Sequence, residues 1–132
     1  MKTKRLHLVA GILFGLVVAG LVAAPASAKP SNKWRIQVSE GANSDGEIVF
    51  RVEPVGGQPM EVRVAVKDGT RENAVAKTIR DAMEAQLPQD GYHVEVDDGE
   101  DLLVKAKGGA ANFDLNLIDN AVKSVRINLD RE

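Results

Sequence analysis

About seven short runs of alternating apolar and polar residues occupy most of this chain, and they constrain its fold more than any other feature. Neighbouring side chains of a strand point to opposite faces, so alternation gathers the apolar residues of a run on one buried face. The runs cover Trp34 to Ser39, Glu47 to Glu53, Met60 to Lys67, Tyr92 to Asp97, Leu102 to Lys107, Phe113 to Leu117 and Val125 to Asp130. Each is predicted to be a half-buried strand.

One longer run, from Arg71 to Leu87, repeats with a helical period instead. Its apolar residues form a single stripe that would face a core. Thr70 is the expected N-cap, because its hydroxyl can accept an unpaired amide hydrogen of the first turn. Pro88 follows the run and would stop the helix.

The connections between most runs are too short for parallel crossovers, so the predicted class is α+β with mainly antiparallel pairing. We expect a curled sheet of about seven strands, in the order βββαββββ, packed on one helix. Such a sheet would be about 34 Å wide at about 4.8 Å per strand, whereas a helix covers about 10 to 12 Å. Either the sheet curls around the helix, or part of its apolar face is left for a partner.

The first 28 residues have the three parts of a secretory signal peptide. These are a basic start at Lys2, Lys4 and Arg5, an apolar stretch from Leu8 to Ala24, and the small residues Ala26 to Ala28. The alternative is an uncleaved anchor, although the apolar stretch is at the lower limit for crossing a bilayer. Three glycines and the small-residue ending favour cleavage.

The expected organisation is therefore a signal peptide over 1–28, a flexible lead-in over 29–33 and one domain over 34–132. The general secretory route would deliver the domain to the periplasm or the medium, with no membrane contact after cleavage. Cleavage leaves 14 Lys and Arg against 19 Asp and Glu. This acidic balance argues against nucleic-acid partners. The absence of Cys excludes disulfides, zinc–thiolate sites and cysteine nucleophiles.

The stretch from Val62 to Ile118 resembles a small module that recurs in flagellin-type and phage tail-type proteins. The resemblance rests on a Val-rich strand, an Asp-Gly-Thr turn, an Ala-rich helix and three further short strands. The matching segments are Val62 to Val66, Asp68 to Thr70, Ala74 to Ala85, Val94 to Val96, Leu102 to Ala106 and Phe113 to Leu115. The resemblance implies a β-α-β-β structural or interaction module without a catalytic centre, and no functional residue transfers from it.

His93 is the only histidine after the leader and the natural choice for a general base near neutral pH. Alternation places it on a polar face beside Glu95, and no serine lies in a nucleophile motif. We therefore expect a surface histidine and no enzyme. A small hydrolase or lyase that uses carboxylates with His93 is the alternative.

The acidic run Asp97, Asp98, Glu100 and Asp101 is the candidate metal site, because calcium binds clustered carboxylate oxygens. The spacing of an EF-hand is missing, and Asp98-Gly99 between two alternating runs is typical of a hairpin turn. A solvated turn is the preferred interpretation, and a calcium-stabilised binding domain is an alternative. No other cofactor is expected.

Basic residues recur on the outward side of the predicted strands, among acidic neighbours. The candidates for a binding face are Trp34, Arg35, Arg51, Arg63, Lys105 and Arg126. Such a face could recognise another protein by charge, or its charges could simply pair across the strands. Trp34 could be either the edge of a core or a binding anchor.

Taken together, the sequence predicts a small exported protein of the bacterial envelope or exterior that acts as a protein-binding or structural module. Its expected partner is another protein or a second copy of itself. The main reasons are the leader, the sheet that is wide for one helix, and the lack of an assembled catalytic set.

Overall fold

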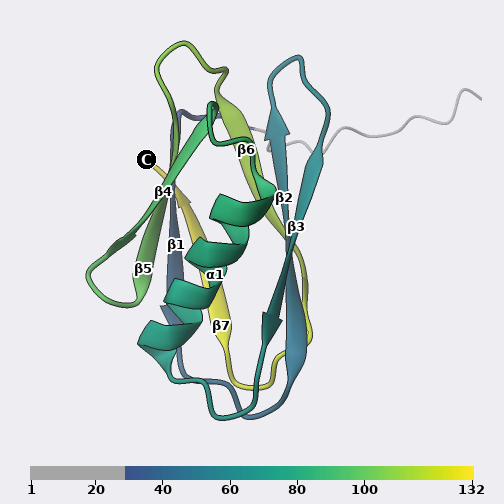
Figure 1. Ribbon diagram of the computed structural model, residues 1–132, viewed down its shortest axis with the longest axis vertical. Coiled ribbons are helices and arrows are strands. Elements are labelled where there is room, and N and C mark those ends of the chain that lie inside the picture. The colour runs from purple at the N-terminus through teal and green to yellow at the C-terminus, as the bar shows by residue number, and fades with distance from the viewer. Residues whose placement is uncertain (1–28) are drawn as a thin grey trace, which may run out of the picture.

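A computed structural model describes residues 29–132, and the predicted signal peptide lies outside the described residues. The predicted order of three strands, one helix and four strands is confirmed (Figure 1). The elements are β1 (Lys33–Ser39), β2 (Gly46–Pro54), β3 (Met60–Val66), α1 (Glu72–Gln86), β4 (Tyr92–Asp97), β5 (Asp101–Ala106), β6 (Phe113–Asn120) and β7 (Arg126–Arg131).

The strands form two sheets, so the prediction of one curled sheet is wrong. The four-stranded sheet has the order β4-β5-β1-β7 and the three-stranded sheet the order β3-β2-β6, and all pairings are antiparallel. At the end of β6, the Asn120 side chain accepts the Val122 N–H at 3.1 Å and donates to the Val125 carbonyl at 2.8 Å. A side chain thus binds the backbone groups where a β6–β7 ladder would begin.

Helix α1 fills the open side between the two sheets (Figure 1). It packs against β3, an edge of one sheet, and β4, an edge of the other, and it also reaches β1 and β5. Its buried face consists of Val75, Ala76, Ile79 and Met83. The inner faces of both sheets and this helical stripe therefore share one core.

The expectation that an apolar sheet face is left over for a partner is wrong. Among residues 29–132, the large apolar side chains that are clearly exposed are Val55 at 58% and Ile118 at 49%. The strands divide into two sheets whose inner faces pack together, and the helix covers the open side of the core that they share. The apolar faces that one wide sheet would expose are therefore buried within the domain.

The free edge of β3 is closed by the last residue of α1. The Arg63 backbone N–H donates to Gln86 Oε1 at 2.9 Å, and Gln86 Nε2 donates to the Arg63 carbonyl at 2.8 Å. A neighbouring strand would make the same two bonds. The side-chain amide of Gln86 therefore takes the place of a strand at this edge.

The helix begins without the predicted cap. The Thr70 hydroxyl donates to the Lys67 carbonyl at 2.7 Å, and the N-cap residue is Arg71, whose side chain makes no capping bond. Gly69 has a φ of +82°, and the turn it makes carries Thr70 over the preceding strand end. The local turn thus takes the hydroxyl away from the helix.

The segment before β1 was expected to be a flexible lead-in, but Ser31 belongs to the folded domain. It exchanges two backbone hydrogen bonds with Phe113, each 2.9 Å, and its hydroxyl donates to the Glu132 carbonyl at 2.6 Å. The Trp34 indole N–H also donates to the Phe113 carbonyl, at 2.8 Å. Trp34 is 8% exposed and lies in the core, so it is not an anchor on a binding face.

We expect Trp34→Phe to lower the free energy of unfolding by about 1–3 kcal/mol, because it removes a buried hydrogen bond and part of an aromatic ring from the core. Urea denaturation followed by circular dichroism measures this loss. Fluorescence is unsuitable, since Trp34 is the single tryptophan. Unchanged stability would show that the indole bond to Phe113 contributes nothing.

Candidate binding groove

The basic residues predicted to share one binding face are divided between two faces. Arg35 on β1, Lys105 on β5 and Arg126 at the start of β7 belong to the four-stranded sheet, whereas Arg51 and Arg63 belong to the three-stranded sheet. The inner faces of the sheets meet in one core, so their outer faces point in opposite directions. A single basic face is therefore absent from the described structure.

Arg35 is held by three carboxylates on the outer face of the four-stranded sheet. Its Nε donates to Glu132 at 2.6 Å, and its Nη1 donates to Asp97 at 3.0 Å and Asp101 at 3.2 Å. These bonds, above all the one to Glu132, raise the pKa of Arg35 further above its usual range. Arg35 also lies across from Leu103, an outward apolar residue that is only 6% exposed. Its role here is structural.

Two other candidate residues are also paired. Arg63 binds Glu47 at 2.8 Å and Glu61 at 3.0 Å, and Lys105 binds Glu95 at 2.5 Å. The bond from Lys105, with a smaller contribution from His93, lowers the pKa of Glu95. Charge pairing across the strands thus describes these positions better than recognition of a partner.

The acidic run forms a turn between β4 and β5, as the hairpin interpretation predicts. Asp98 and Gly99 have positive φ values of 49° and 69°. Asp97 and Asp101 lie opposite one another at the start of the ladder, and both are bonded to Arg35. Within residues 29–132, no group of three or more acidic or histidine side chains is arranged to hold a metal ion.

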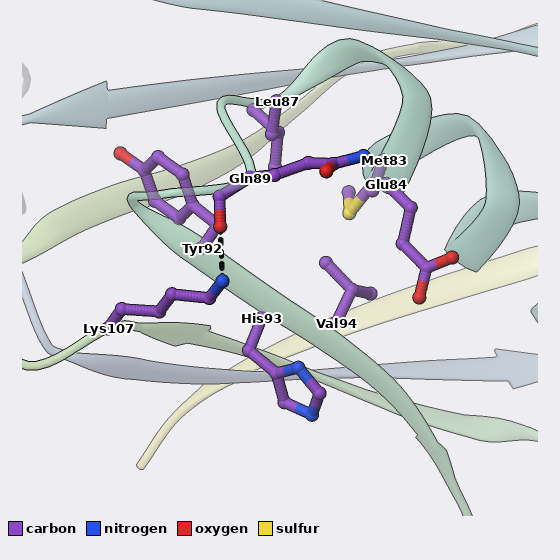
Figure 2. A pocket seen from close by; sticks show the side chains of 8 residues that line it. All are labelled: Met83, Glu84, Leu87, Gln89, Tyr92, His93, Val94 and Lys107. Atoms are coloured by element: carbon purple, nitrogen blue, oxygen red, sulfur yellow. Dashed lines mark hydrogen bonds between the residues drawn. The ribbon is translucent and has the colours of Figure 1, made fainter.

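A pocket of about 190 Å³ lies between α1 and β4 (Figure 2). The buried side chains of Met83, Leu87 and Val94 form its floor, and the exposed residues Glu84 and Lys107 lie at its rim. Alternation alone could not indicate it, because it depends on how α1 meets the edge of the sheet. The one feature of the sequence that could have indicated the pocket is the short link with Pro88, which joins the helix to the next strand.

His93 also lines this pocket, but its imidazole points away from the floor (Figure 2). Its Nε2 lies 3.3 Å from Glu95 Oε2 on the outer face, and its side chain is 57% exposed. This is the position that alternation predicts. The structure gives it a carboxylate partner.

The pocket opens along the free edge of β4. The Lys107 N–H donates to the Gly91 carbonyl at 2.9 Å, so the odd-numbered residues of β4 bond to β5. The Tyr92 N–H points away from β5 and donates to the Pro88 carbonyl at 3.1 Å. The peptide groups of Val94 and Val96 therefore face away from the sheet, and Val94 borders the pocket.

The charges of the pocket are separated. The Lys107 ammonium donates to the Gln89 carbonyl at the end where α1 and β4 are joined, while Glu84 lies towards the opposite end (Figure 2). Tyr92 stands beside the pocket with its ring edge against Phe113, at 5.2 Å between centroids, and burial raises its pKa. The pocket thus combines an apolar floor, one cation and one anion.

The chain matches no protein-family model and no curated protein sequence. The resemblance of Val62 to Ile118 to flagellin-type modules therefore stays a prediction. Across residues 29–132, the single helix is too short and too polar to cross a membrane.

The Glu132 carboxylate makes the stability of the domain depend on pH. The bonds from Arg35, and then from Lys33, hold its pKa below the ordinary value of 4.5. A carboxylate with a lowered pKa in the folded state stabilises the fold above its unfolded pKa, and this stabilisation is lost as the pH falls through the folded pKa.

We therefore expect Glu132→Gln to be less stable than the wild type at neutral pH, with a difference that shrinks as the pH falls below 4.5. Urea denaturation at a series of pH values measures it. The control is Glu53→Gln, which removes an exposed carboxylate with no ion pair in the described chain. A difference that is independent of pH would contradict the assignment.

Proposed function

We propose that this protein is a non-enzymatic protein-binding module that accepts an extended segment of another protein as an added strand along β4. The observation that carries the proposal is the outward peptide group of Val94 beside a pocket with an apolar floor and a charged rim. Strand addition derives affinity from backbone hydrogen bonds and specificity from pockets for alternate side chains. The edge of β4 offers both.

The other sheet edges are occupied to different extents. Gln86 binds the edge of β3 at Arg63, and Ser31 pairs with β6 at Phe113. β7 has its free edge on the side of β6. β4 is the edge at which a pocket with a buried apolar floor adjoins the outward peptide groups. It is therefore the best-equipped edge for a peptide strand.

The chemistry of the pocket favours binding over catalysis. Lys107 and Glu84 lie at different ends, so they do not form an acid–base pair, and His93 is engaged by Glu95 on the outer face. A floor of Met83, Leu87 and Val94 suits one aliphatic or aromatic side chain. The pattern of residues 1–28 supports action in the periplasm or outside the cell.

The test uses peptides selected by residues 29–132 from a randomised library. We expect Val94→Pro to weaken their binding at least about tenfold, which corresponds to about 1.4 kcal/mol. Proline removes the outward N–H and puts its ring there, and edge strands tolerate proline where the N–H faces outward. Isothermal titration calorimetry measures the change.

Glu61→Pro is the matched control, because Glu61 also has its N–H on a free edge, on β3, away from the pocket. It should bind the peptides as the wild type does. Should Val94→Pro unfold, amide shifts of the wild-type protein decide the matter: saturation with peptide should move Met83, Leu87 and Val94. Selection of no peptide, or shifts confined to other residues, would refute the proposal.

A further inference from the structure

The pocket between α1 and β4, together with the free edge of β4 beside it, forms a groove that is closed at one end. α1 ends at Gln86 and β4 begins at Tyr92, so the short link between them crosses this end. Within the link, the Pro88 carbonyl accepts the N–H groups of Gly91 and Tyr92, both at 3.1 Å. The edge position beside Tyr92 is therefore occupied, and an added strand cannot continue past it.

The direction of the added strand decides which of its ends arrives there. An antiparallel strand runs opposite to β4, so its carboxyl end reaches the beginning of β4, whereas a parallel strand would bring its amino end. Every strand pairing in the described sheets is antiparallel. Antiparallel pairing is also slightly more stable per residue.

The charge at the closed end agrees with a carboxyl terminus. The Lys107 ammonium lies at this end, where it donates to the Gln89 carbonyl (Figure 2). An ammonium has three N–H donors, so it can bind a carboxylate while it keeps this bond. Glu84 lies towards the other end, away from an incoming carboxylate.

We propose that the groove binds the carboxyl terminus of a partner protein, an inference that rests on the proposed function. The terminal carboxylate binds Lys107, the backbone of the last residues pairs with Val94, and one apolar side chain lies on Met83 and Leu87. The ligand class is thus a protein chain that ends in an apolar segment. An acidic side chain inside a peptide is the competing source of a carboxylate.

The experiment compares two peptide libraries, one with free carboxyl ends and one in which the random segment is followed by a fixed Gly-Ser tail. We expect tighter binders from the first. The best of these is then made as the free acid, as the carboxyl amide and with a Gly-Ser-Gly extension. Amidation should weaken binding to the wild type about tenfold or more, the scale of one charge-assisted bond.

Lys107→Met removes the ammonium but keeps an apolar stem, and it should bind acid and amide equally weakly. Lys107→Arg should keep part of the preference for the acid. The control is Lys123→Met, an exposed lysine between β6 and β7 that lies outside the pocket lining, and it should behave as the wild type does. Each affinity is measured by titration calorimetry at one fixed salt concentration.

Two kinds of failure are distinguishable. The carboxyl-terminus assignment would be overturned if the acid, the amide and the extended peptide bound equally well. It would also be overturned if an amide with an internal acidic residue bound as tightly as the acid. Strand addition would stand in both cases. A preference for the acid that survives in Lys107→Met would overturn the role of Lys107. Failure of both libraries to yield a binder would refute the proposed function itself.

Discussion

The structure depends on the packing of helix α1 into the opening between two antiparallel sheets. Neither sheet could bury its inner face alone: the three-stranded sheet presents Val62, Val64 and Phe50 to the core, and the other presents Ile36 and Leu102. The helical stripe supplies the missing apolar surface on the open side. Removal of this area from water is worth about 25 cal/mol per Å². One helix thus makes a single core from strands that share no continuous ladder.

The same packing has different consequences at its two sides. Towards β3, the side chain of Gln86, the last residue of α1, reaches the strand edge and hydrogen-bonds to the Arg63 N–H and carbonyl. Towards β4, the buried residues Met83 and Leu87 line the pocket together with Val94. The helix therefore bonds to the edge of β3 at Arg63, while a pocket lies between it and β4.

Period-two and helical patterns located every element, because burial on one face is a local property of the sequence. Val62, Val64 and Val66 show this, since all three are buried as their alternation predicts. The pattern could not show which strands pair, and there the prediction of one sheet was wrong. Strand pairing depends on contacts between distant residues, such as the bonds of Asn120 to the backbone of Val122 and Val125 and the packing across the core. Leu103 breaks the alternation: it is only 6% exposed although it lies on the outer face, across from Arg35 of β1.

An open strand edge is also a liability, because it can pair with any exposed strand of another chain. The closed end of the β4 groove limits this risk. A strand that continues beyond Tyr92 meets the link from α1, whose Pro88 carbonyl already accepts the Tyr92 N–H. A chain that ends there meets no such obstacle and finds Lys107 beside its carboxylate. The link that joins helix to strand therefore obstructs strands that continue past Tyr92 by the same geometry that leaves room for a terminus.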